Sequence, residues 1–293
     1  MSHIPAERCL SIIQLLSEEA GEFPLGEIAE RLDLPKSGTH RLLTALVEQG
    51  WVQQDDQTGY YRLTMRLAVL GQRFYVATGI PDICQPMLDQ LAAVSGEYVR
   101  LAVVDGDQLV WVAHAQGARS GLIYQPTLHS NAVPLHATAT GKAWLSTLPL
   151  EQAVQLALGG AAFQNPQAYG PDVARSVDQV MAELRATLER GYGIARNEAE
   201  QGVSAMATVV RSGAEGAVAG TVSIAGPSAR MTEARMNDLV PALQATAAEI
   251  SGLWPARLRR NPATSDRVAT AHPSDRHLTN SGPARSVSSA RRA

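Results

Sequence analysis

The chain has 293 residues, 45% of them hydrophobic and only 5% aromatic, and its formal net charge is −3. This length allows two domains with separate cores. The only cysteines, Cys9 and Cys84, are far apart in the sequence, which argues against a disulfide framework or a thiolate metal site and fits a cytoplasmic protein. We find no export signal and no apolar run near the roughly 18 residues of a membrane span, so no membrane partner is expected.

Charge is unevenly distributed along the chain. Residues 1–78 hold seven Lys and Arg against ten Asp and Glu, residues 79–254 hold ten against sixteen, and residues 255–293 hold eight against two. The last segment is rich in Arg, Ser, Pro and Ala, which predicts a disordered basic tail. Such a tail either adds non-specific DNA affinity or is a solvated extension without a function.

Three helices are predicted in the first 50 residues, over 5–19, 26–32 and 36–49. Apolar residues recur at helical spacing along the third helix, at Leu42, Leu43, Leu46 and Val47, so this face should be buried. The residues off that stripe carry cations, hydroxyls and an imidazole, which are the groups that contact phosphates and base edges. We therefore interpret this helix as a DNA recognition helix, with outward residues Lys36, Ser37, Gly38, His40, Arg41 and Thr44.

The turn between the second and third helices fits a helix-turn-helix. Ala29 is small, as the close approach of the two helices requires, and Leu34, Thr39 and Leu42 occupy positions expected to be buried. Asp33 stands where a left-handed residue is needed, and Asp visits that region more readily than most residues. A plain helical hairpin with a solvated cationic face is the alternative, and the acidic balance of residues 1–78 favours it.

A β-hairpin is predicted next, with strands at 51–54 and 60–63 around a polar turn. Helices followed by a hairpin are typical of a winged helix-turn-helix. Arg62 on the second strand either reaches a phosphate or the minor groove, or is an ordinary surface residue. The following helix, 65–77, ends at Gly79-Ile80-Pro81, and its apolar side suits a dimer contact. Pairing would present two recognition helices to half-sites about one helical turn apart.

The remainder of the chain alternates helices and strands in a way that predicts an α+β sensor-like domain. Asp105-Gly106 is a hairpin turn signal between two strands, and Gly226-Pro227 is a second turn. Helices are predicted over 86–95, 138–146, 151–158, 172–190 and 232–253, and strands over 98–104, 108–113, 121–124, 203–211 and 216–224 and around Ile194.

Enzyme motifs are incomplete in this sequence. The Gly141-Lys142 pair lacks the first glycine and the hydroxyl residue of a P-loop, and the run 202–206 lacks the second glycine of a nucleophile elbow. His114, His129 and His136 have no diagnostic metal-ligand spacing. We therefore expect no cofactor, no metal and no catalytic residue.

Several runs together resemble the IclR family of bacterial transcriptional regulators. They are Leu25–Ala29, Leu34–Ser37, His40–Leu43, Pro134–Ala143, Gly202–Ala205 and Ser223–Pro227. The chain departs from the family pattern at Asp33, usually Gly, and at Gly38, usually Ser or Thr. Gly38 removes a hydroxyl from the DNA-facing helix and weakens that helix by up to about 1 kcal/mol relative to Ala.

The resemblance implies an α+β protein with an N-terminal winged helix-turn-helix and a C-terminal GAF-like effector-binding domain, working as a homodimer or a dimer of dimers. The implied boundaries are 1–64 for the DNA-binding domain, 65–79 for a linker helix, 80–254 for the effector-binding domain and 255–293 for the tail. The resemblance also places an effector pocket at Leu122, Gln125, Val133, Ala139, Thr140, Ala195, Val203, Ala205, Ser223 and Ala225.

The chemistry of that set suits a small carboxylate with an apolar body. Ala139 and Thr140 fall in the first turn of a helix, where free N–H groups favour an anion. No charged residue belongs to the set, and Lys142 and Arg196 are near it only in sequence. The expected function is a ligand-responsive regulator, a repressor, that binds double-stranded operator DNA. The alternatives are an activator, a small-acid-binding enzyme, or a non-specific architectural DNA binder.

Overall fold

The computed structural model describes residues 5–18, 21–126, 133–159, 165–213 and 216–254. The predicted tail at 255–293 and the predicted last residue of the first helix lie outside the described residues. Across the described ranges, no helix combines the length and the apolar character needed to cross a bilayer.

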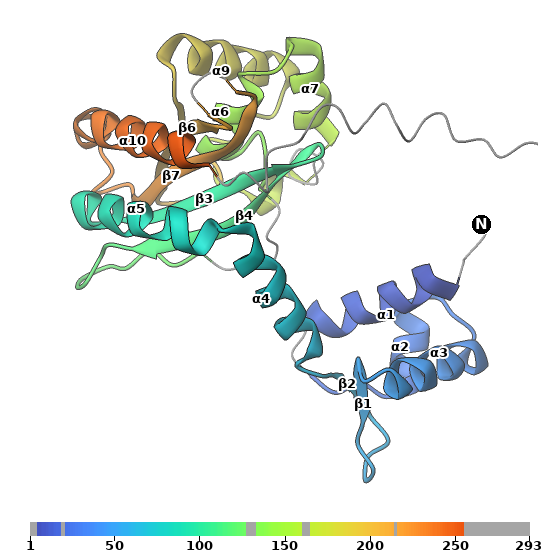
Figure 1. Cartoon of the computed structure of the whole chain (residues 1–293). Helices are drawn as coiled ribbons and strands as arrows, with labels where there is room; N and C mark the ends of the chain where they lie inside the picture. Colours follow the sequence, from blue (N-terminus) through green and yellow to red (C-terminus); the bar gives the residue numbers. More distant parts are fainter. Residues whose placement is uncertain (1–4, 19–20, 127–132, 160–164, 214–215, 255–293) are drawn as a thin grey trace, which may run out of the picture. The chain divides into compact units, whose positions relative to one another are not determined.

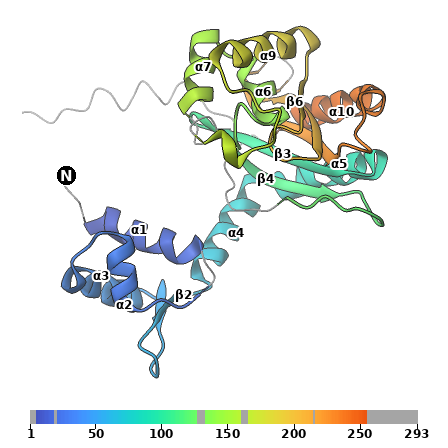
Figure 2. The same ribbon diagram turned by 180° about the vertical axis from the view of Figure 1, so that it is seen from behind.

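The first part of the fold is a helical trio followed by a two-stranded hairpin (Figure 1). A single core joins α1, α2, α3 and the hairpin, with Ile12, Ile28 and Leu43 fully buried at its centre. The hairpin strands pair antiparallel, and the hairpin projects as the wing in Figure 2. The bounds are α1 (Pro5–Glu18), α2 (Leu25–Arg31), α3 (Lys36–Glu48), β1 (Val52–Gln54) and β2 (Tyr61–Leu63).

The tight turn between α2 and α3 depends on one residue with left-handed backbone geometry. Asp33 has φ of +50°, as the sequence predicts for this position, and the N–H of Leu34 donates to the carbonyl oxygen of Ala29 at 2.9 Å. Ala29 itself is buried, so the two helices approach closely at this small side chain. The helix-turn-helix prediction is confirmed in these details.

The next helix, α4 (Arg66–Thr78), is mostly exposed. The guanidinium of Arg66 stacks on the Trp51 ring at 4.9 Å and donates to the carbonyl oxygen of Gln49. Large apolar side chains along α4 face solvent, among them Met65 just before it and Phe74, which are 75% and 73% exposed. The helix ends at Gly79, whose φ of +79° is left-handed.

The second part is built on a five-stranded antiparallel sheet in the order β4-β3-β7-β6-β5. The sheet pairs segments that are far apart in the sequence, since β3 and β7 are neighbours in its middle. The bounds are β3 (Tyr98–Asp105), β4 (Gln108–Gln116), β5 (Gly193–Arg196), β6 (Val203–Arg211) and β7 (Val218–Pro227).

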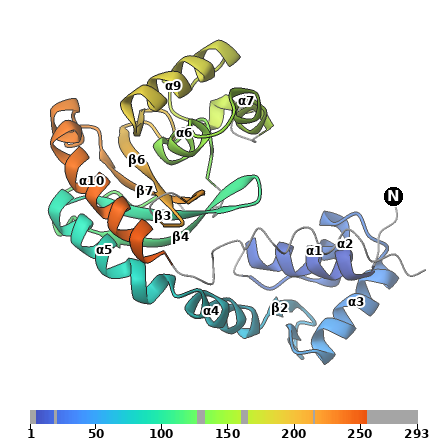
Figure 3. The same cartoon turned by 45° about the horizontal axis from the view of Figure 1, so that its top comes forward.

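Helices cover the two faces of this sheet in separate layers (Figure 3). One face carries α5 and α10 over a core that includes Leu101, Met206 and Ile224. The other face carries α6, α7 and α9. The bounds are α5 (Ile80–Ser95), α6 (Ala139–Leu145), α7 (Leu150–Gly159), η1 (Pro166–Ala168), α9 (Val177–Arg190) and α10 (Glu233–Leu253).

The α+β prediction is confirmed, whereas several local predictions are wrong. Residues 121–126 form no strand. The long helix begins at Val177 instead of Asp172, because Ser176 caps it by accepting from the N–H of Gln179. Helix α5 begins at Ile80 instead of Pro86, since Pro81 in the first turn has no N–H to leave unsatisfied. Gly226 and Pro227 continue β7 instead of turning.

Candidate DNA-binding and effector sites

The recognition helix α3 presents its predicted polar side chains to solvent. Lys36, Ser37, His40, Arg41 and Thr44 are all exposed, and Gly38 is half-buried. On the opposite side Thr39, Leu43 and Leu46 are buried, but Val47 is 36% exposed, so its predicted burial is wrong. Val47 lies at the edge of the apolar stripe, in the last turn of α3. The cationic face is therefore available to a partner.

The start of α3 is suited to an anion. Pro35 is the N-cap and provides no side-chain hydrogen bond to the helix, and the first turn carries no acidic side chain. The N–H of Thr39 donates to Pro35, whereas the preceding N–H groups point out of a helix of 13 residues. Free N–H groups beside Lys36 favour binding of a phosphate.

The wing residue Arg62 is exposed but already has a partner. Its Nη1 lies 3.1 Å from Oε1 of Glu22. The tip of the hairpin is ordered by Asp55, whose carboxylate accepts from the N–H groups of Gln57 and Thr58. These hydrogen bonds hold the pKa of Asp55 below its usual value. The turn of the wing is thus held by its own hydrogen bonds, and Arg62 on the second strand is held by Glu22.

Part of the predicted effector set lies together on the sheet face covered by α6. Ala195, Ala205 and Ala225 are register partners across β5, β6 and β7. Ala139 of α6 packs against this region. The helix comes very close, since a Cβ added to Gly193 would overlap the carbonyl oxygen of Ala139. Small side chains and a glycine are therefore what allow α6 to lie on the sheet.

Other members of the set are spread around this face. Thr140, Val133 and Ser223 are buried and Val203 is half-buried. Leu122 is 68% exposed and Gln125 is also exposed, so the structure does not bring these two into the buried group. Their loop is nevertheless held in place. Arg230 donates to the carbonyl oxygen of Leu122 at 2.8 Å and forms a bidentate pair with the buried Glu97 at 2.6 and 2.8 Å.

The start of α6 is predicted to favour an anion, but not all of its backbone N–H groups are free to bind one. The Thr138 hydroxyl accepts from the N–H of Gly141 at 3.0 Å, so one N–H of the first turn is satisfied internally. Lys142 is 1% exposed, and its ammonium is 2.6 Å from Glu198. The P-loop-like lysine is therefore committed to a buried ion pair. Arg196 is exposed and lies 3.6 Å from Glu233.

The sequence analysis missed Arg100, which is the charged side chain of this sheet face. Arg100 on β3 is the register partner of Ser223 on β7. Its guanidinium lies 3.7 Å from the centroid of the Trp111 ring and 5.7 Å from that of Tyr98. The signal was present in the strand, because Val99 and Leu101 alternate with Tyr98 and Arg100 at a period of two. The residues facing α5 thus implied an arginine on the other face.

Aromatic side chains surround Arg100. The Tyr98 and Tyr124 rings meet edge to face with centroids 6.0 Å apart. Burial raises the pKa of the Tyr124 phenol to about 12, and the nearby Arg100 opposes that rise while Glu200 adds to it. Burial also lowers the pKa of Arg100 below its ordinary value. The face thus combines a half-buried cation with flat aromatic walls.

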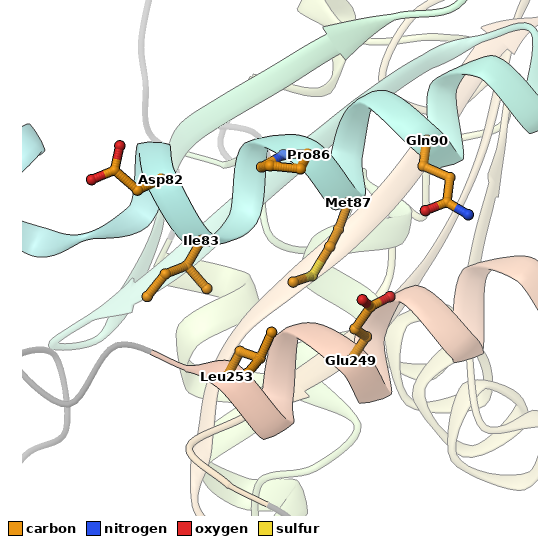
Figure 4. Close-up of a pocket in the computed structure, with 7 residues that line it drawn as sticks. All are labelled: Asp82, Ile83, Pro86, Met87, Gln90, Glu249 and Leu253. Carbon is orange, nitrogen blue, oxygen red and sulfur yellow. The ribbon is translucent and has the colours of Figure 1, made fainter.

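A separate groove of about 380 Å³ lies between α5 and α10 (Figure 4). Met87 of α5 and Leu253 of α10 line its interior, and Asp82 and Glu249 are also among its lining residues. These helices cover the sheet face opposite to Ser223 and Ala205. The groove is therefore not part of the predicted effector set.

The fold and the exposed cationic helix define a DNA-binding transcriptional regulator with an attached effector domain. The IclR helix-turn-helix domain matches residues 5–56, and the C-terminal domain of bacterial IclR transcriptional regulators matches residues 73–252. The chain belongs to the IclR family. The resemblance inferred from the sequence motifs is thereby confirmed.

Known relatives and solved structures agree with this assignment. The transcriptional repressor AllR of Escherichia coli K12 is 28% identical over 245 residues, covering 84% of this chain and 88% of AllR. An IclR regulator of Alicyclobacillus acidocaldarius has a TM-score of 0.71 at 23% identity, covering 87% of this chain and 100% of that one. An IclR homologue of Microbacterium hydrocarbonoxydans, solved with 4-hydroxybenzoate, has a TM-score of 0.66 at 21% identity, covering 85% and 98%.

Proposed function

We propose that the chain is a cytoplasmic repressor that binds operator DNA through α3 and the wing. The observation that carries the proposal is the exposed cationic face of a recognition helix whose other face is buried. Lys36 and Arg41 supply charge for phosphates, while Thr44 donates to the carbonyl oxygen of His40 and keeps its lone pairs for a base amino group. The proposed contacts are Lys36, Ser37, Gly38, His40, Arg41, Thr44 and Arg62.

Repression is the favoured sign of regulation because AllR, which matches over most of its length, is named a repressor. The proposed effector is a small organic acid. Support comes from the 4-hydroxybenzoate of the Microbacterium protein and from the group of small and hydroxyl side chains on the α6 side of the sheet. The proposed effector residues remain those predicted from the sequence, and binding without turnover is proposed for them.

A homodimer is proposed because one recognition helix gives little specificity. The exposed apolar side chains of α4, which include Leu67, Leu70 and Phe74, form the surface that is proposed to pair. We also propose the boundaries 1–64, 65–79, 80–254 and 255–293 for the functional parts of the chain.

The test is operator selection followed by release. The full chain is incubated with a pool of random duplexes, and bound sequences are amplified and sequenced. We expect an enriched, two-fold symmetric site, and weaker binding of that site when 4-hydroxybenzoate or benzoate is added. Enrichment of no sequence, with a steep salt dependence, would show a non-specific DNA binder instead. Tighter binding on addition of the acid would reverse the sign of the proposed response.

A further inference from the structure

Arg100 is a cation without an anionic partner in the described part of the chain. Within residues that the structure describes, its guanidinium makes no ion pair and no hydrogen bond, and its Nε is buried without a partner. Its contacts are instead the faces of Trp111 and Tyr98. A partly buried cation whose Nε has no hydrogen-bond partner is costly, so such a group is retained where an anion binds.

Buried hydroxyl groups that also lack a hydrogen-bond partner lie beside Arg100. Ser223 is the register partner of Arg100, and Thr221 is the register partner of Ala102, two residues along β3. Both residues are on the α6 face, and their side-chain oxygens are buried without a hydrogen-bond partner. A buried hydroxyl is normally hydrogen-bonded. A cation and hydroxyls that all lack an acceptor point to a missing group rich in oxygen acceptors.

We infer that Arg100, together with Ser223, binds the carboxylate of the effector, and that the effector is a flat aromatic monocarboxylate. This inference rests on the proposed function and names the ligand class of that same site. A guanidinium pairs with a carboxylate through two parallel hydrogen bonds, and the Ser223 hydroxyl can donate to the same carboxylate.

The surroundings of Arg100 set the rest of the ligand. Tyr98, Trp111 and Tyr124 provide ring faces and edges, and the side chains of Ala205 and Ala225 on the neighbouring strands are small. Aromatic rings pack favourably against other rings in stacked or edge-on contacts. A planar body therefore fits better than a branched aliphatic one.

Glu200 argues for a single carboxylate. It interacts electrostatically with the Tyr124 phenol and with Arg100. A second negative charge on the ligand near this residue would be repelled. Benzoate should therefore bind, while phthalate, which adds a neighbouring carboxylate, should bind more weakly, and benzamide, which has the same shape without charge, should not bind.

The test uses the full chain, with titration calorimetry and thermal unfolding in the presence of benzoate, benzamide and phthalate. Arg100→Gln removes the charge, and Arg185→Gln is the matched control because Arg185 is exposed on α9. We expect benzoate to raise the melting temperature of the wild type and of the control. In Arg100→Gln the dissociation constant for benzoate should rise about 30-fold or more.

If Arg100 is retained for a ligand, removing its unpaired charge should leave the melting temperature of the ligand-free protein unchanged or raise it. If Arg100 has a purely structural role, the same substitution should lower that melting temperature. Equal affinity of wild type and Arg100→Gln for benzoate would overturn the inference, as would wild-type affinity for benzamide equal to that for benzoate. Operator selection by the wild type is a separate readout: failure to select an operator while benzoate still binds would overturn the proposed function and leave this inference standing.

Discussion

The ammonium of Lys142 lies 2.6 Å from a carboxylate oxygen of Glu198, and both residues are buried. Lys142 also lies 3.2 Å from Glu183 of α9 and donates to the carbonyl oxygen of Ile194 on β5. Burial raises the pKa of Glu198, and Lys142 opposes that rise. This one side chain thus ties α6, which carries the proposed effector residues Ala139 and Thr140, to the edge strand and to α9.

Removing Lys142 should therefore be strongly destabilising. Lys142→Met leaves the buried Glu198 without its cation, and we expect a loss of about 3–5 kcal/mol in the free energy of unfolding, measured by denaturant titration. Glu198→Gln should cost less because Glu183 and the Ile194 carbonyl still satisfy the ammonium. The double variant should recover part of the Lys142→Met loss, and strict additivity of the two changes would contradict the pairing.

His136 should make stability sensitive to acid. Burial, helped by the charge of Lys142, lowers the pKa of His136 to about 4, whereas an unfolded histidine titrates near 6.5. The unfolded chain therefore binds the proton first as pH falls. The contribution is fully present above about pH 6.5 and is lost toward pH 4, by about 3 kcal/mol.

The measurement for His136 is the free energy of unfolding between pH 7 and pH 4 for the wild type and His136→Gln. The wild type should lose more stability over this range, and the difference should follow a single proton. His114→Gln, at an exposed histidine, controls for the substitution. Parallel pH curves for wild type and His136→Gln would show that the buried imidazole carries no such linkage.

Gly38 offers a stabilising change on the recognition helix. It lies inside α3, and a Cβ at this position meets nothing within 4 Å. Gly38→Ala should raise the free energy of unfolding by up to about 1 kcal/mol, because glycine loses more backbone entropy on helix formation. Gly71, also helical with open space around its Cβ position, provides a matched Gly→Ala comparison away from α3. A loss of stability at Gly38 alone would show that the glycine is needed for the fold.

The DNA-binding part of the fold could be predicted well because its signals are local. Helical periodicity placed α1, α2 and α3, and the need for a left-handed residue in a tight turn was met at Asp33, which has φ of +50°. Ala29 is small, and it is buried where α2 and α3 approach closely. The error at Val47 arose because an apolar residue at the edge of a helical stripe faces solvent when no neighbouring element reaches it.

The effector site could be predicted only in part because it is assembled by strand register. No local pattern shows that β3 lies beside β7, and this pairing is what places Arg100 opposite Ser223. The charge of the site was therefore overlooked, although the alternation around Arg100 already assigned it to the face away from Val99 and Leu101. The false strand at 121–124 has a similar cause, since its loop is held by Arg230 and Glu97, over 100 residues apart in the sequence.

The charges of α3 should determine the salt dependence of operator binding. Each lysine or arginine that neutralises a phosphate releases counterions, so the logarithm of the binding constant falls linearly with the logarithm of salt concentration. Lys36→Gln and Arg41→Gln should each weaken binding of the selected operator and reduce the salt slope by about 1. Arg185→Gln, on the effector part, should change neither. If the two α3 variants keep the wild-type affinity and slope, α3 does not contact the phosphates, and the assignment of its exposed cations to DNA is wrong.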